Sequence, residues 1–315
     1  MEKRSASNST KTEDSYPRFS LSSLGFGPSA TSKCSLPPPP PPVEVLLSEE
    51  ESSVKSNVES IIIDEGLTLL KGRVSTFDVF GVANSDLVPG KYEGGLKLWE
   101  GSIDLVKRLQ SEVQEGQLLL RGKRVLELGC GHGLPGIFAG LVGAGAIHFQ
   151  DFNAEVLRSL TIPNVKVNLE KHLNQQLSLL TDNNSISISP DVRFFAGDWN
   201  EVHQILPYGC NTVDQKETNV SLEDKSLDGY DVILMAETVY ALSSLHSLYG
   251  LIKRSMHHPS GVIYMAGKKH YFGVGGGTRQ FVNLVEEDGL MRACLLAGVA
   301  DGSSNVREVW KFIFK

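Results

Sequence analysis

A cluster of glycines directly behind a short apolar run, in the segment Val125 to Gly136 (VLELGCGHGLPG), constrains this chain more than any other feature. Arg124 to Leu128 is predicted to be a short buried strand. The glycines after it have no Cβ, so the backbone of that turn can approach a ligand closely. Pro135 suits the first turn of a helix that we expect to continue to Gly143. Strand, turn and helix together form the first half of a nucleotide-binding βαβ unit.

Two interpretations of this turn compete. Gly131, Gly133 and Gly136 have the GxGxxG spacing of a dinucleotide site, in which the helix N-terminus holds a pyrophosphate. The pattern ExGxGxG, from Glu127 through Gly129, instead resembles motif I of the S-adenosylmethionine-dependent methyltransferases. In those enzymes the acid stays close to the cationic ligand and the glycines pass beneath its amino acid and ribose. A carboxylate at the end of a buried strand is costly without a partner, and a sulfonium ligand supplies one where a pyrophosphate does not. The turn alone leaves both interpretations open.

The rest of the chain predicts a sheet with helices on both faces. Further strands are expected at residues 146–151, 192–196, 230–236 and 261–266, with helices between them, followed by strands at 290–296 and 306–314. Parallel strands with helical crossovers form a doubly wound sheet, whose ligand site lies at the carboxyl ends of the strands. The short polar turn between the last two strands implies an antiparallel hairpin. We therefore predict an α/β fold with a mostly parallel seven-stranded sheet and a C-terminal antiparallel hairpin.

Composition divides the chain into a tail and one domain. Residues 1–57 are rich in Ser, Pro and charge and are predicted to be disordered, because they cannot bury enough apolar surface. The run Pro37 to Pro42 should form polyproline II, which could dock an aromatic groove or serve as a stiff linker. Residues 58–315 are predicted to form the functional domain, with an N-terminal extension at 58–120 and a polar insertion at 207–229.

Composition also limits the classes of function. The chain has 315 residues, of which 41% are hydrophobic, enough for a sizeable core. A net charge of −7 and a pI near 5.7 argue against general affinity for nucleic-acid phosphates. Four cysteines without CxxC spacing indicate reduced thiols in a cytosolic or nuclear protein. No apolar run approaches the roughly 18–20 residues of a membrane span, and we expect neither secretion nor a membrane. The neighbouring His257 and His258 have no third ligand nearby, so no metal is predicted.

Beyond the glycine turn, three segments resemble one family. They are Ser85 to Glu100 (SDLVPGKYEGGLKLWE), Ala236 to Tyr240 (AETVY) and His270 to Gly277 (HYFGVGGG), together with Phe149 to Asn153 (FQDFN). They resemble the histidine protein methyltransferases, which belong to the seven-β-strand class I methyltransferases. The resemblance covers the chain from about residue 61 onward. It implies S-adenosylmethionine as cofactor and, as partner, a large-subunit ribosomal protein that is methylated on histidine. It also implies a cytoplasmic and nuclear location, with the nucleolus as a candidate compartment.

The same resemblance implies roles for residues at the strand ends. Trp99 should cover the methionine end of the cofactor and Asp151 the ribose, while Asp198 should accept from the adenine amino group and Trp199 pack on the base. Ala236 is commonly serine in the family. The expected cofactor-binding residues are Leu98, Trp99, Glu100, Gly101, Ser102, Glu127, Gly129, Gly131, Gly133, Gln150, Asp151, Phe152, Gly197, Asp198, Trp199 and Ala236. At Gly101 the family usually has cysteine. Either tryptophan could instead be an ordinary core aromatic.

The expected catalytic residues are Glu237, Tyr240 and His270. A neutral imidazole already has the lone pair that attacks a methyl group, so the enzyme mainly has to hold the other ring N–H. A lysine ammonium must first lose a proton, which favours a desolvated aromatic slot. The polar pair Glu237 and Tyr240 therefore favours histidine. A lysine methyltransferase and a non-catalytic scaffold for a ribosomal protein are the alternatives. Glu237 could also be only a helix-terminal acid, and His132 in the glycine turn is expected to be solvated. We expect a monomer that binds a protein substrate and not nucleic acid.

Overall fold

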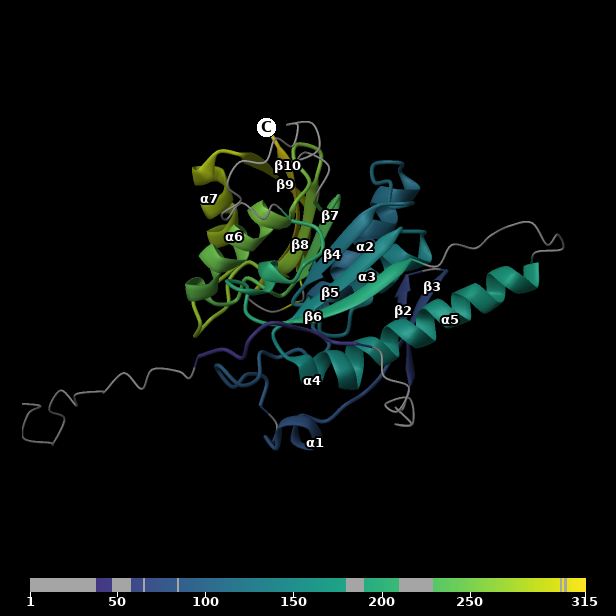
Figure 1. Ribbon diagram of the computed structural model, residues 1–315. Helices are drawn as coiled ribbons and strands as arrows, with labels where there is room; N and C mark the ends of the chain where they lie inside the picture. The colour runs from purple at the N-terminus through teal and green to yellow at the C-terminus, as the bar shows by residue number, and fades with distance from the viewer. Residues whose placement is uncertain are drawn as a thin grey trace, which may run out of the picture. The chain divides into compact units, whose positions relative to one another are not determined.

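Within the residues that the structure describes, eight strands form one sheet in the order β1-β6-β5-β4-β7-β8-β10-β9 (Figure 1). The computed structural model describes residues 38–46, 58–64, 66–83, 85–179, 190–209, 229–300, 302 and 305–315, all in the compact unit Pro38–Lys315. The strands are β1 Val43–Glu44, β4 Arg124–Leu128, β5 Ala146–Asp151, β6 Asp191–Ala196, β7 Val232–Ala236, β8 Val262–Lys268, β9 Met291–Ala300 and β10 Val306–Phe314.

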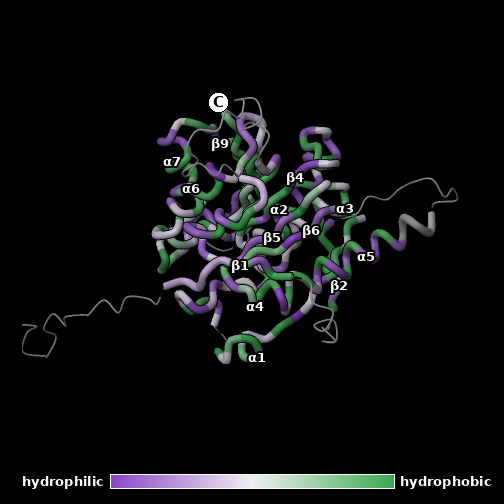
Figure 2. The backbone as a smooth tube through the Cα atoms, viewed as in Figure 1, coloured by the Kyte–Doolittle hydropathy of each residue, from purple (hydrophilic) through white to green (hydrophobic). Residues whose placement is uncertain are grey.

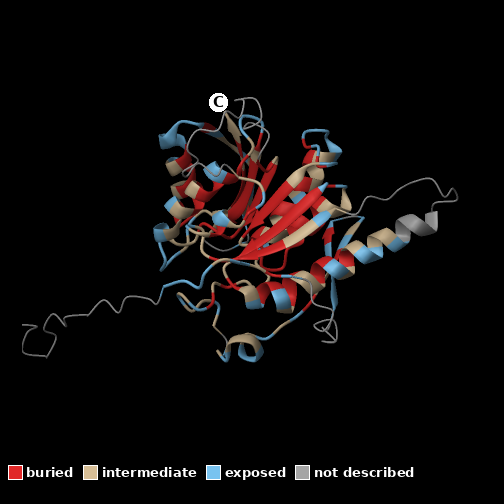
Figure 3. Cartoon of the chain, in the orientation of Figure 1, coloured by how far each residue is buried: buried red, intermediate tan, exposed pale blue. Residues whose placement is uncertain are grey.

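Five neighbouring strands of this sheet, β6, β5, β4, β7 and β8, are parallel. β4 (RVLEL) and β7 (VILMA) are almost entirely buried, as expected for parallel strands with both faces covered (Figure 3). From β4 the chain continues to β5 on one side, and the later β7 lies on its other side. The carboxyl end of β4 is therefore the switch point of the sheet, where open α/β sheets bind ligands.

Helices cover both faces of the sheet, as predicted. Along one face run α2 (Glu100–Gln114) and α3 (Leu134–Leu141), whose apolar side chains pack with Val125, Ile147 and Leu234. Along the other run α6 (Leu245–Ser255) and α7 (Thr278–Asp288), which pack with Leu126 and Ile233. Consecutive residues of a strand thus enter opposite cores. Figure 2 shows the hydrophobic stretches gathered in these central elements.

The predicted C-terminal antiparallel hairpin is confirmed, and its second strand, β10, is inserted into the sheet. β10 pairs antiparallel with β9 and also with β8, so it lies between the two. The predicted strand total of seven is exceeded because β1 adds an antiparallel edge strand to β6. Arg193 of β6 donates two hydrogen bonds of 2.7 Å to the Glu44 carboxylate, which fixes this short strand.

The position of β1 corrects the prediction that residues 1–57 are disordered. That prediction is wrong for Val43–Glu44, because backbone pairing and an ion pair hold a segment too short and polar to stand out in the sequence. The rest of the tail, apart from 38–46, and residues 210–228 of the predicted insertion lie outside the described residues.

The predicted N-terminal extension forms its own small sheet. β2 (Glu59–Asp64) and β3 (Leu67–Lys71) form an antiparallel hairpin, followed by α1 (Thr76–Phe80). Two side chains of the long helix α5 (Ile162–Leu179) hold it, because Asn168 accepts from Leu70 N–H at 2.8 Å and Asn164 accepts from Gly72 N–H at 2.6 Å. α5 continues from α4 (Ala154–Val156) through a π-helical turn at Leu157–Thr161.

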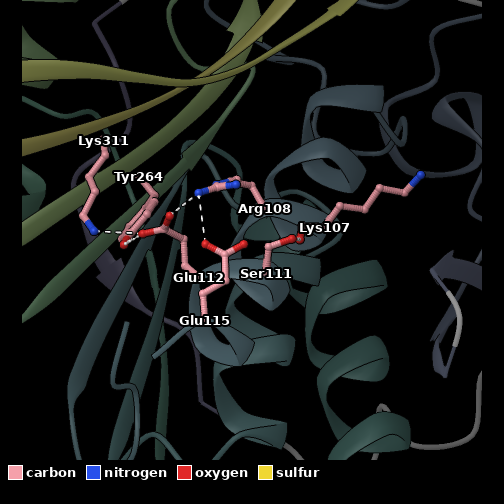
Figure 4. Close-up of polar contacts among 7 residues, drawn as sticks. All are labelled: Lys107, Arg108, Ser111, Glu112, Glu115, Tyr264 and Lys311. Carbon is pink, nitrogen blue, oxygen red and sulfur yellow. Dashed lines mark hydrogen bonds and ion pairs between the residues drawn. The ribbon is translucent and has the colours of Figure 1, made fainter. Parts of the chain in front are cut away.

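A buried carboxylate anchors α2 to the sheet (Figure 4). Glu112 accepts from Tyr264 of β8 at 3.0 Å, from Lys311 of β10 at 2.8 Å and from Arg108 one turn earlier. Burial of this acid, 3% exposed, is compensated by these donors, which lower its pKa. The anchored helix begins at the carboxyl edge of the sheet, where Glu100 and Gly101 lie at its N-terminus.

Several features outside the sheet bear on the sequence predictions. Across the described residues, no helix is both long and apolar enough to cross a membrane. In the same part of the chain, no three His, Cys, Asp or Glu side chains converge on a common point that could hold a metal. Cys130 and Cys294 are free, whereas Cys34 and Cys210 lie outside the described residues.

Candidate functional site

The glycine turn after β4 is shaped by close contacts that exclude side chains. Gly129, Gly131 and Gly133 have positive φ angles of 59°, 48° and 72°. A Cβ on Gly131 would lie 2.9 Å from the carbonyl oxygen of Gly95, and one on Gly129 would lie 2.7 Å from Cγ2 of Thr238. Both the backbone conformation and the packing therefore require glycine. Glycine at these positions lets the turn pack directly against Gly95 and Thr238.

Glu127 has a partner within the protein. Its side chain is 1% exposed, and it accepts a hydrogen bond of 2.7 Å from the N–H of Gly136 in the first turn of α3. Burial raises the pKa of this carboxyl well above its ordinary value, and Asp151 raises it further. The sequence predicts a cationic ligand as the partner of this acid. The structure supplies a helix N-terminus instead, so Glu127 by itself does not separate the two interpretations of the turn.

Asp151 and Gln150 hold the glycine turn in place from the end of β5. Asp151 accepts from Gly131 N–H and from Asn153 N–H, each at 3.0 Å, and burial raises its pKa to about 6. Each of its oxygens keeps a lone pair for a further donor such as a ribose hydroxyl. Gln150 accepts from Gly129 N–H at 3.3 Å and donates to the Gly197 carbonyl at 2.9 Å. Phe152 follows, half-buried.

The expected adenine side lies at the end of β6. Gly197 donates to the Asp151 carbonyl at 3.0 Å, and Pro42 packs so closely that a Cβ on Gly197 would lie 2.9 Å from it. Trp199 is half-buried and donates its indole N–H to Gln150 at 2.9 Å. Asp198 Oδ1 accepts from the backbone and side chain of Asn200, which leaves Oδ2 for another donor. These residues meet the glycine turn through Gln150.

The segment before α2 closes over the same edge. Trp99 precedes the helix, donates its indole N–H to the Gly94 carbonyl at 3.0 Å and lies beneath the Lys97 ammonium at 4.3 Å. Leu98 packs against the core, and Ser102 N–H donates to the Trp99 carbonyl at 3.1 Å. Both predicted tryptophans are therefore half-buried, and Trp199 also packs against the core.

His132 corrects a prediction. It was expected to be solvated, but it is 5% exposed and its Nε2 lies 3.1 Å from the Leu96 carbonyl. Burial lowers its pKa to about 4, so the ring is neutral at physiological pH and can donate to that carbonyl. Sequence could not indicate this, because the segment that covers His132 comes from 36 residues earlier in the chain.

Glu237 is held in a strained backbone conformation directly after Ala236, the last residue of β7. Its φ is 59°, in the left-handed region that residues other than glycine rarely adopt. Its carboxylate accepts from Gly101 N–H at 3.1 Å and from the Tyr271 hydroxyl. The side chain is 8% exposed, and burial raises its pKa. A Cβ on Gly101 would lie 2.6 Å from Glu237 Oε1, so glycine there allows the acid to reach the helix N-terminus.

A cavity of about 140 Å³ opens beside Glu237, and we call it the acceptor cavity. Tyr240 lines it and donates its hydroxyl to Glu93, which also accepts from Gly90 N–H at 3.1 Å. Its lining residues are Asp86, Leu87, Glu93, Gly94, Trp99, Glu237, Tyr240, Tyr271 and Val274.

Of the predicted catalytic residues, the structure brings Glu237 and Tyr240 to the acceptor cavity but not His270. That histidine is exposed and its backbone carbonyl accepts from Asn305 at 2.7 Å. Tyr271 takes its place, with its hydroxyl bonded to Glu237. The sequence places Tyr271 beside His270 near the site but does not single it out as catalytic, and it gives no sign of Glu93, although both residues lie in segments already singled out. Glu93 belongs to an irregular segment, where no periodicity indicates the direction of a side chain.

Several known methyltransferases are similar to this chain. A sequence profile for a family described as lysine methyltransferase matches residues 89–185. The histidine protein methyltransferase 1 homolog of Dictyostelium discoideum is 37% identical over 225 residues, covering 71% of this chain and 59% of that protein. Its Bos taurus counterpart is 36% identical over 235 residues, covering 70% and 56%. Histidine protein methyltransferase 1 of Schizosaccharomyces pombe is 33% identical over 206 residues, covering 62% and 58%.

The chain thus spans a little more than half the length of these relatives. Among solved structures, magnesium protoporphyrin IX methyltransferase from Synechocystis with bound S-adenosylhomocysteine is a distant likeness. It has a TM-score of 0.43 and 9% identity, covering 68% of this chain and 83% of that one. Over about 70% of its length, the chain is similar in sequence to histidine protein methyltransferases.

Proposed function

We propose that this protein is an S-adenosylmethionine-dependent protein-histidine N-methyltransferase. The observation that carries the proposal is a pair of carboxylates, Glu93 and Glu237, in the wall of an otherwise mostly apolar acceptor cavity. The side-chain donors among its lining residues are Trp99, Tyr240 and Tyr271, and each already donates within the protein, to Gly94, Glu93 and Glu237. The cavity therefore offers its occupant hydrogen-bond acceptors, namely phenol and carboxylate oxygens.

An imidazole fits such a cavity in size and in polarity. A cavity of about 150 Å³ can hold a benzene ring, so one of about 140 Å³ has room for the smaller imidazole. A neutral imidazole has one N–H donor and one lone pair. When the acceptors bind the N–H, the lone pair is free to face a methyl donor. Glu93 and Glu237 also favour the positive charge that the ring gains on methylation.

The residues at the other strand ends fit S-adenosylmethionine, which supplies the methyl group when bound. The glycine turn would lie beneath the methionine and ribose, Asp151 would accept from ribose hydroxyls, and Asp198 with Trp199 would hold the adenine. Trp99 and the turn before α2 would keep water from the methyl group. Methyl transfer would form an N–C bond as the S–C bond breaks, and the methylated ring would then lose its N–H proton to water from a pKa near 6.5.

A lysine substrate is the second candidate. The matching family profile is described as lysine methyltransferase, and the cavity has more aromatic surface than the sequence suggested, with Trp99, Tyr240 and Tyr271 in its wall. Adjacent carboxylates, however, stabilise an ammonium in its charged form, which has no lone pair. Lysine starts from a pKa of about 10.4 and histidine from about 6.5, so this cavity suits histidine better.

From the family resemblance we extend the proposal to a large-subunit ribosomal protein as substrate, and to a monomer that acts in the cytoplasm and nucleus. The test is incubation with labelled S-adenosylmethionine and ribosomal proteins from cells that lack the enzyme, followed by mass spectrometry of labelled peptides. A methyl group on histidine supports the proposal. A methyl group on lysine would overturn the substrate assignment, and binding without transfer would favour a scaffold.

Thermal-shift titration separates the cofactor from a dinucleotide. A ligand that binds only the folded state raises the melting temperature. We expect S-adenosylhomocysteine to do so and NAD not to. Stabilisation by NAD alone would end the methyltransferase assignment.

A further inference from the structure

Thr238 has a buried hydroxyl without a partner. It follows Glu237 beyond the end of β7 and is 3% exposed. Across the described part of the chain, its Oγ1 makes no hydrogen bond. A buried hydroxyl left unpaired destabilises a protein, whereas valine would fill nearly the same space without that cost. A water or a bound ligand that hydrogen-bonds this hydroxyl would remove the cost.

The position of Thr238 indicates which partner. A Cβ on Gly129 would lie 2.7 Å from Cγ2 of Thr238 and 3.9 Å from Cζ2 of Trp199. The methyl group of Thr238 thus packs against the glycine turn, close to the indole of Trp199. The neighbouring polar groups are already engaged, since Trp199 donates to Gln150 and Gln150 also accepts from Gly129 N–H. The threonine hydroxyl can both donate and accept.

We propose that Thr238 is a cofactor-binding residue whose hydroxyl hydrogen-bonds the nucleoside half of S-adenosylmethionine between the glycine turn and Trp199. This rests on the proposed function, because it takes the cofactor as given. It goes beyond it in assigning a side-chain hydrogen bond to the segment just after β7, a strand that lies on the opposite side of β4 from β5 and Asp151. The cofactor would satisfy a hydrogen-bonding group that the protein alone leaves unpaired.

The test measures S-adenosylhomocysteine binding by calorimetry together with the melting temperature of the ligand-free protein. Thr238→Val removes the hydroxyl at nearly constant volume. We expect the dissociation constant to rise about tenfold, the effect of one lost hydrogen bond, while the ligand-free melting temperature stays the same or rises. Thr238→Ser keeps the hydroxyl and should bind within about threefold of the wild type.

Thr278→Val is the matched control. That threonine is also fully buried, but its hydroxyl donates to Glu308 at 2.5 Å. Loss of this hydroxyl should lower the melting temperature and leave cofactor affinity unchanged. That is the opposite of what we expect for Thr238→Val. If Thr238→Val binds S-adenosylhomocysteine as the wild type does, the proposal is wrong.

A fragment identifies which half of the cofactor is contacted. 5′-Methylthioadenosine carries the nucleoside without the amino acid, and Thr238→Val should weaken its binding as much as that of S-adenosylhomocysteine. Unchanged affinity for this fragment would place the contact on the amino acid half and overturn the assignment to the nucleoside. A folded wild-type protein that does not bind S-adenosylhomocysteine would overturn the proposed function, a result distinct from either variant outcome.

Discussion

The glycine turn and the acceptor cavity lie at the same edge of the sheet but are built in different ways. The turn is continuous chain, shaped by positive φ angles and held by backbone N–H groups that donate to Gln150 and Asp151. The cavity is assembled from three separate segments around Glu93, Glu237 and Tyr271, and its chemistry comes from side-chain oxygens. A local backbone motif suits a cofactor shared by many enzymes. A surface assembled from several loops can differ between relatives and thus select the substrate.

The largest effect should follow from filling the glycine turn. Gly131→Ala places a Cβ 2.9 Å from a backbone carbonyl oxygen that cannot rotate away. We expect affinity for S-adenosylhomocysteine, measured by calorimetry, to fall by about 100-fold or more. Gly116→Ala is the control, because Gly116 also has a positive φ, of 72°, but no atom within 4 Å of a new Cβ. Gly116→Ala should lower folding stability by about 1–2 kcal/mol through backbone strain and leave the affinity for S-adenosylhomocysteine unchanged. Equal affinity in both variants would mean that the turn does not touch the cofactor.

Changing the acceptor cavity should separate catalysis from cofactor binding. Glu237→Ala removes the acceptor of Gly101 N–H and Tyr271, so the substrate loses a positioned oxygen. We expect turnover to fall about tenfold or more while S-adenosylhomocysteine binds almost normally. Single-turnover methylation and calorimetry measure the two quantities, and the melting temperature reports any loss of folding. An equal loss of cofactor affinity would contradict the division of labour between turn and cavity.

The pH dependence of cofactor affinity tests Asp151. Its pKa in the free protein is raised to about 6 by burial, and only the ionised carboxylate can accept from both ribose hydroxyls. Protonation therefore competes with binding as the pH falls through 6, and at pH 5 the dissociation constant should be about tenfold larger than at pH 7. Asp151→Asn should bind weakly but lose this pH dependence. If Asp151→Asn still loses affinity as the pH falls below 6, another group is responsible for the titration.

The smallest effect is expected at His270. Its side chain is exposed and does not line the acceptor cavity, so His270→Ala should lower turnover by less than about threefold. Tyr271→Phe removes the hydroxyl bonded to Glu237 and should lower it more. Steady-state rates on the same protein substrate compare the two. A larger loss of turnover in His270→Ala than in Tyr271→Phe would instead indicate a catalytic role for His270.

The sequence alone determined the sheet and the glycine turn. β4, β5 and β10 begin and end where the apolar pattern predicts, because strand periodicity and glycine conformation are local properties. Local pattern also identified the ends of β5, β6 and β7 as the edge at which polar residues meet. It did not predict β1, whose two residues are held only by pairing with β6.

The tertiary structure decided which polar groups are still free to bind something. Sequence could not show that Glu127 is satisfied by Gly136, that His132 is covered by Leu96, or that Gln150 holds Trp199. Nor could it show that Tyr271, and not His270, lines the acceptor cavity, or that Tyr240 donates its hydroxyl to Glu93. Each of these outcomes depends on a partner distant in sequence or on the direction of one side chain in a loop. A residue type fixes which hydrogen bonds a side chain can make, but only the folded chain decides which of them are already made.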